Sequence, residues 1–126
     1  MRAIDTNVLV RMITRDDPRQ AAKADAFVAT GAWVSLLALA EATWVLASVY
    51  EMSLPEVATS VRMLLAHEQL TIQDPDVVEA ALAGIEGKPA VSFSDALLLE
   101  LARKAGHLPV GTFNHSLAKR DGAEKL

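Results

Sequence analysis

The sequence has no cysteine among its 126 residues. Disulfide bonds and thiolate metal sites are therefore excluded, and the absence fits a reducing compartment such as the cytoplasm. Glycine and proline are scarce, with 6 and 5 residues, and no linker, low-complexity segment or internal repeat interrupts the chain. We therefore predict a single domain over residues 1–126, a length at which a chain buries a hydrophobic core without cross-links.

Long apolar runs are also missing. The longest, "LLALAEATWVLASV" from Leu36 to Val49, contains Glu41. As a helix it would reach about 21 Å, whereas a bilayer core requires about 30 Å. The N-terminus lacks the basic and apolar regions of a signal peptide. We therefore expect a cytoplasmic protein without a membrane segment.

The sequence also has no excess of positive charge. The formal net charge of −4 argues against a nucleic-acid partner. Basic residues nevertheless gather at Arg11, Arg15 and Arg19, and again near the C-terminus. If several acids surround a bound cation, the rest of the surface is less negative than the net charge suggests. A solvated surface of mixed charge explains the same distribution, so charge alone leaves both interpretations open.

Hydrophobic patterning predicts strands that alternate with helices. Segments 2–5, 32–35, 70–73 and 108–113 have the length and composition of strands, and the segments between them have the length of helices. Expected helix caps include Ser35, Ser53 and Asp16 or Asp17. This order is typical of an α/β fold with a parallel sheet, in which sites form beyond the carboxyl ends of the strands. Asp5 and Asn114 both stand at such ends.

Asp5, Thr6 and Asn7 interrupt an otherwise apolar stretch. One interpretation is helix capping, because all three residue types satisfy free amides at a helix N-terminus. Three candidate caps in a row are redundant, however. At least one of them is therefore left for other chemistry.

Glu41 lies in a helix that is almost wholly apolar, with Leu37, Ala38, Trp44 and Val45 three and four positions away. An ionised carboxylate in such surroundings is costly unless it is paired or bound to a cation. The alternative is that Glu41 lies on the one solvent-exposed stripe of its helix.

Asp95 and Asn114 each have a structural interpretation beside the functional one. Asp95 opens the helix "SDALLLELA", where an acid complements the helix dipole and Ser92 or Ser94 could share the cap. Asn114 in "GTFNHS" is a good cap for a short helix. The histidines show no metal-ligand spacing, and no Ser-His-acid set or glycine-rich phosphate loop is present.

Taken together, "IDTNVLVR", the Glu41 helix, "SDALLLELA" and "VGTFNHSLAKRDGAEKL" resemble the PIN-domain nucleases, most closely the toxin subunits of VapBC toxin–antitoxin pairs. The resemblance implies a three-layer α/β/α domain with a central, mainly parallel sheet, and a metal-dependent endoribonuclease. Family members usually work as homodimers on specific RNAs. A cognate VapB-type antitoxin inhibits them by filling the active-site groove.

The resemblance carries the family's acidic quartet onto four positions of this chain, three of them acids. The residues that it singles out are the acids Asp5, Glu41 and Asp95 and the polar neighbours Thr6, Asn7, Thr112 and Asn114. Carboxylate oxygens suit Mg²⁺ or Mn²⁺, which can activate water for attack on a phosphodiester. Arg11 and Arg15 are candidate contacts to RNA phosphates.

One departure from the family stands at the fourth position, where the usual "TFD" is "TFN". Asn114 offers a carbonyl oxygen but no charge, so we expect weaker metal binding, particularly of a second ion. Because of Asn114, the alternative that the protein is a non-catalytic module, which acts by binding an antitoxin or nucleic acid, stays open. A phosphatase of the haloacid dehalogenase type is another alternative, but Asn7 stands where its second aspartate is expected.

Overall fold

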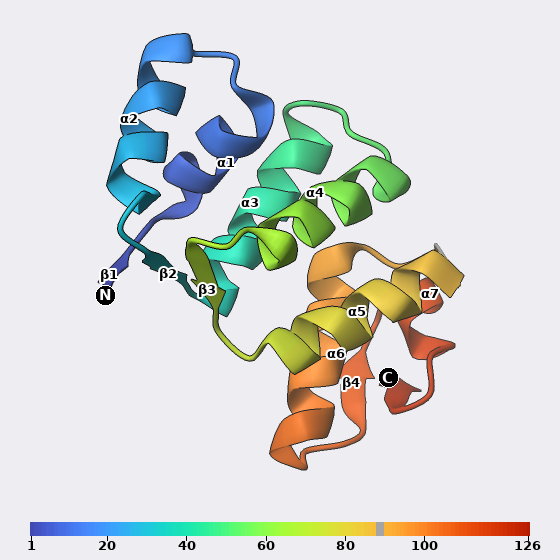
Figure 1. Ribbon diagram of the computed structural model, residues 1–126. Helices are drawn as coiled ribbons and strands as arrows, with labels where there is room; N and C mark the ends of the chain where they lie inside the picture. Colours follow the sequence, from blue (N-terminus) through green and yellow to red (C-terminus); the bar gives the residue numbers. More distant parts are fainter. Residues whose placement is uncertain (88–89) are drawn as a thin grey trace. The chain divides into compact units, whose positions relative to one another are not determined.

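Strands and helices alternate along the chain, as the sequence predicts (Figure 1). The computed structural model describes residues 1–87 and 90–126, which form two compact units, Met1–Asp74 (unit 1) and Pro75–Leu126 (unit 2). Each unit carries parallel strands with helices between them. The predicted class, α/β with parallel strands, is therefore confirmed.

Unit 1 contains a three-stranded parallel sheet with the order β1-β2-β3. Its elements are β1 (Arg2–Ala3), α1 (Thr6–Thr14), α2 (Pro18–Val28), β2 (Ala32–Val34), α3 (Leu36–Ser48), α4 (Leu54–Ala66) and β3 (Leu70–Ile72). In the sheet Ala32 pairs with Arg2 on one side and with Leu70 on the other. Helix α1 packs against both α2 and α3, and α3 packs against α4.

Unit 2 contains a pair of parallel strands and three helices. Its elements are α5 (Pro75–Gly87), α6 (Phe93–Ala105), β4 (Val110–Thr112), α7 (His115–Ala118) and β5 (Ala123–Lys125). Strand β4 pairs with β5, so that Val110 lies opposite Ala123. Helices α5 and α6 pack closely against each other, and α7 contacts both strands.

The helices begin and end where short-range signals in the sequence place them. Asp17 caps α2 by accepting a hydrogen bond from Gln20 N, with Pro18 in the first turn. Ser35 caps α3, and Ser53 forms a capping box on α4. Gly106 ends α6 with a φ of +82°, a conformation that glycine adopts without steric cost.

Large apolar side chains fill the interior of each unit. In unit 1 the fully buried residues include Leu9, Leu39 and Leu46, and in unit 2 they include Leu82 and Phe93. Burial at this level contributes about 1.5–3 kcal/mol for each large side chain. Among the described residues, no helix is long and apolar enough to cross a membrane.

Candidate functional site

Asp5 lies two residues after the end of β1 and caps helix α1. Its Oδ1 atom accepts a hydrogen bond from Val8 N at 3.1 Å, and the side chain is exposed to solvent. The capping interpretation of Asp5 therefore accounts for one carboxylate oxygen. Its other oxygen, Oδ2, has no hydrogen-bond partner among residues 1–87 and 90–126. That oxygen is available for other chemistry.

Thr6 links the same strand end to the middle of α3. Its Oγ1 atom donates a hydrogen bond to Glu41 Oε2 at 2.9 Å, across 35 positions of the sequence. The close packing of α1 against α3 makes this contact possible. The carboxylate of Glu41 is thereby held beside the residue that follows Asp5.

Glu41 lies on a solvent-exposed stripe of α3. The structure therefore agrees with the second of the two interpretations of Glu41, although the residue has apolar neighbours in the sequence. The flanking side chains are exposed as well, with 71% of Leu37 and 64% of Trp44 accessible to solvent. The helix buries its opposite face, which includes Leu39 and Leu46. Two large apolar side chains therefore border this carboxylate at the surface of unit 1.

Asp95 stands in the first turn of α6, but another residue caps that helix. Ser92 Oγ accepts the hydrogen bond from Asp95 N at 3.2 Å. The Asp95 carboxylate is half-buried and makes no hydrogen bond or ion pair with the described residues. The structural interpretation of Asp95 is thus reduced to its interaction with the helix dipole.

Asn114 follows β4 in the way that Asp5 follows β1. Its Oδ1 atom caps α7 by accepting from Leu117 N at 2.9 Å, and its backbone N donates to Thr112 Oγ1 at 2.9 Å. The predicted cap is confirmed. Because this amide carries no charge, the end of β4 lacks the carboxylate that Asp5 provides at the end of β1.

Arg11 and Arg15, the candidates for phosphate contacts, are both held by other side chains. Arg15 binds Asp25 through two hydrogen bonds of 2.6 and 3.2 Å, and the hydrogen bond from Arg15 lowers the pKa of Asp25. Arg11 contacts Asp16 at 3.3 Å and donates to Tyr50 Oη at 3.0 Å, an interaction that raises the pKa of Arg11. Both guanidinium groups would have to share these partners with a phosphate.

A groove in unit 1 adjoins Asp5. It has a volume of about 400 Å³ and runs between α1 and α2. Asn7 and Arg11 line it from α1, and Lys23 and Phe27 line it from α2. Sequence reasoning missed Lys23. The signal was present in the spacing 20, 23, 24 and 27, which is one face of a helix, but only the packing of α2 shows that this face meets Asp5.

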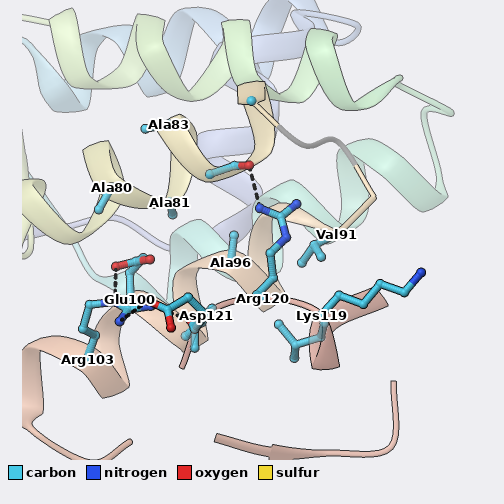
Figure 2. Close-up of a pocket in the computed structure, with 14 residues that line it drawn as sticks. Ala80, Ala81, Ala83, Val91, Ala96, Glu100, Arg103, Lys119, Arg120 and Asp121 are labelled. Atoms are coloured by element: carbon cyan, nitrogen blue, oxygen red, sulfur yellow. Dashed lines mark hydrogen bonds and ion pairs between the residues drawn. The ribbon is translucent and has the colours of Figure 1, made fainter. Parts of the chain in front are cut away.

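Unit 2 has a hollow of its own, about 340 Å³ in volume, among α5, α6 and α7 (Figure 2). Small side chains such as Ala80 form part of its lining. Several of its charged side chains are engaged with the protein, since Arg103 contacts Glu100 at 3.2 Å and Arg120 donates to Gly84 O at 2.8 Å. None of the predicted site residues lines this hollow.

A family model for the PIN domain matches residues 3–123 of this chain. The chain therefore belongs to the PIN-domain family, a family of nucleases that generally use a divalent metal. One solved structure to which the chain is similar is that of VapC20 from Mycobacterium tuberculosis, described as a toxin that cleaves the sarcin–ricin loop. The two chains are 16% identical, with a TM-score of 0.44 over 94% of this chain and 93% of that one. No curated protein sequence matches this chain significantly.

The side chains of unit 1 fit a divalent cation by their chemistry. Asp5 has a free carboxylate oxygen, and Thr6 holds Glu41 at the same strand end. Oxygen ligands of this kind are those that Mg²⁺ and Mn²⁺ prefer. Within the described ranges, no group of three or more His, Asp and Glu side chains lies together. Unit 1 thus supplies two acids of the predicted set, and unit 2 contains the third, Asp95.

Proposed function

We propose that this protein is a divalent-metal-dependent endoribonuclease and the toxin component of a VapBC-type toxin–antitoxin pair. In this proposal Asp5, Glu41 and Asp95 hold Mg²⁺ or Mn²⁺, and all three act within one domain that spans residues 1–126. Membership of a nuclease family supports the reaction class. The choice of residues is supported by what each carboxylate does in its own unit.

The hydrogen bond between Thr6 Oγ1 and Glu41 Oε2 carries the proposal. Glu41 has no structural task in unit 1 that would require a charge, because it is exposed and no cation is paired with it among the described residues. A threonine hydroxyl nevertheless orients it towards the end of β1. Such outer hydrogen bonds typically fix the direction of metal-binding carboxylates.

Each residue has a separate part in this site. Asp5 and Glu41 would bind the cation from unit 1, and Asp95 would bind it with the carboxylate that Ser92 leaves free of capping. A bound divalent cation supplies Lewis acidity, which lowers the pKa of water and compensates negative charge on a phosphodiester. Thr6 and Asn7 would support the acids, as would Thr112 and Asn114 beyond β4.

The partners follow from the same proposal. The substrate would be an RNA, and a VapB-type antitoxin would cover the site until it is released. A homodimer in the cytoplasm is the expected form. The exposed Leu37 and Trp44 of α3 give the surface of unit 1 an apolar area suited to protein contacts.

A second candidate function is a non-catalytic PIN-fold module that acts through its antitoxin and nucleic acid. Asn114 favours it, because the position that is acidic in the family is neutral here and its Oδ1 atom already caps α7. The match to the PIN domain over residues 3–123 disfavours a phosphatase of the haloacid dehalogenase type.

RNA cleavage measured with Mg²⁺ or Mn²⁺, and again with excess chelator, tests the proposal. We expect endonucleolytic products only when the metal is present. Products that persist with chelator would overturn the metal dependence, whereas RNA binding without any cleavage would favour the second candidate. Growth arrest on expression, relieved by the product of a neighbouring small gene, would support the toxin role.

A further inference from the structure

Lys23 on α2 lines the same groove as Asp5. It is exposed on α2 and makes no ion pair with the described residues. The neighbouring cations differ in this respect, because Arg11 is held by Asp16 and Arg15 by Asp25. Of the two cations that line the groove, Lys23 alone is free to meet an anion without breaking a contact of the protein.

The rest of the groove is suited to a nucleotide. Asn7 adds an amide beside Asp5, and Val8, Ala24 and Phe27 add apolar surface. Phe27 is half-buried, and the guanidinium of Arg2 lies 3.7 Å from the centre of its ring. Arg2 covers one face of this ring, so an unpaired base would contact the ring surface that lines the groove, as bases do on aromatic side chains, while lysine contacts the phosphate.

We propose that the groove between α1 and α2 binds the single-stranded RNA next to the phosphate that is cleaved, with Lys23 contacting a backbone phosphate and Phe27 supporting a base. This inference rests on the proposed nuclease function, because it takes Asp5 as the point where the reacting phosphate lies. Asp5 and Lys23 both line the groove, so a strand bound along it from Asp5 would meet Lys23 on α2.

Two variants of α2 form a matched pair for the test. Lys23→Gln and Arg19→Gln each lower the formal net charge of −4 by one. Both residues are exposed on the same helix, but Arg19 does not line the groove. Binding of a fluorescent oligouridylate is measured in chelator, where cleavage does not interfere, between about 50 and 200 mM salt.

The loss of one phosphate contact makes the slope of log K against log salt less negative by about 0.7 for a single strand, which is about a fivefold loss of affinity near 0.1 M salt. We expect this change for Lys23→Gln and none for Arg19→Gln. Phe27→Leu should weaken binding by a similar factor at every salt concentration and leave the slope unchanged, since it removes ring surface and no charge. Thermal melting checks that this variant is folded.

Equal changes in slope for Lys23→Gln and Arg19→Gln would overturn the inference, because they would indicate attraction by overall charge. The inference would also be overturned if Lys23→Gln weakened the binding of a protein partner and left RNA binding unchanged. Cleavage measured in parallel separates the two proposals. Metal-dependent cleavage with an unchanged slope defeats the inference alone, and a reduced slope without cleavage in any variant defeats the nuclease proposal alone.

Discussion

The ends of β1 and β4 are built alike but differ in charge. Asp5 and Asn114 each follow a parallel strand, and each caps the next helix through its Oδ1 atom. Asp and Asn are about equally good caps. The charge of Asp5 is therefore not required by the local fold. At the β1 end this charge is accompanied by Glu41, whereas at the β4 end Asn114 is neutral.

Removing the charge at the β1 end should have the largest effect. Asp5→Asn retains the cap, so the thermal midpoint should hardly change, while metal-dependent RNA cleavage should fall by more than about 100-fold. Asp17→Asn is the matched control, because Asp17 caps α2 in the same way and should tolerate the change. Cleavage rates and melting curves of the two variants check this prediction, and equal cleavage by both would contradict it.

Removing the hydrogen bond that orients Glu41 should have a smaller effect on cleavage. Thr6→Val removes the hydroxyl that donates to Glu41 Oε2, and we expect cleavage to fall about tenfold, as for other residues that orient metal ligands. Thr59→Val removes a similar hydroxyl, which donates to Pro55 O within α4. If both variants lose activity to the same extent, the Thr6 contact has no special role.

Adding a charge at the β4 end should have a smaller effect, in the opposite direction. Asn114→Asp keeps the cap of α7, and the new carboxylate should tighten Mn²⁺ binding about tenfold, or about 1.4 kcal/mol. Gln69→Glu adds the same charge at another exposed position. Calorimetric titrations that give one affinity for the parent and for Asn114→Asp would show that position 114 is not a ligand.

A capping change in unit 2 tests whether the two units unfold as one domain. Ser92→Ala should lower the free energy of unfolding by about 1 kcal/mol, because Asp95 N loses its acceptor. Both tryptophans, Trp33 and Trp44, lie in unit 1. A single domain predicts that their fluorescence reports the full loss, whereas an unchanged tryptophan transition would indicate two independent domains. Ser116→Ala serves as the control, since no cap depends on that side chain.

Local elements were predictable because their signals lie within a few residues of each other. Asp17 with Pro18, Ser53 with Glu56, and Gly106 all act within one helical turn. The exposure of Glu41 was less obvious, because its apolar neighbours do not reveal which face of α3 meets the core.

Features that depend on tertiary packing could not be predicted in this way. The pairing of Arg15 with Asp25 and the position of Lys23 in the groove follow from the packing of α2 against α1. The metal ligands themselves stay a prediction, since it is the resemblance to the family that selects Asp95 from among the acids of unit 2.

The most direct test asks whether acids from both units act on one metal ion. Cleavage is measured for Asp5→Asn, Asp95→Asn and the double variant under single-turnover conditions with Mn²⁺. If both carboxylates hold the same ion, the loss of either removes most of its effect, and the double variant should be little slower than the slower single variant. Losses that multiply in the double variant, or an Asp95→Asn variant with full activity, would contradict the shared site.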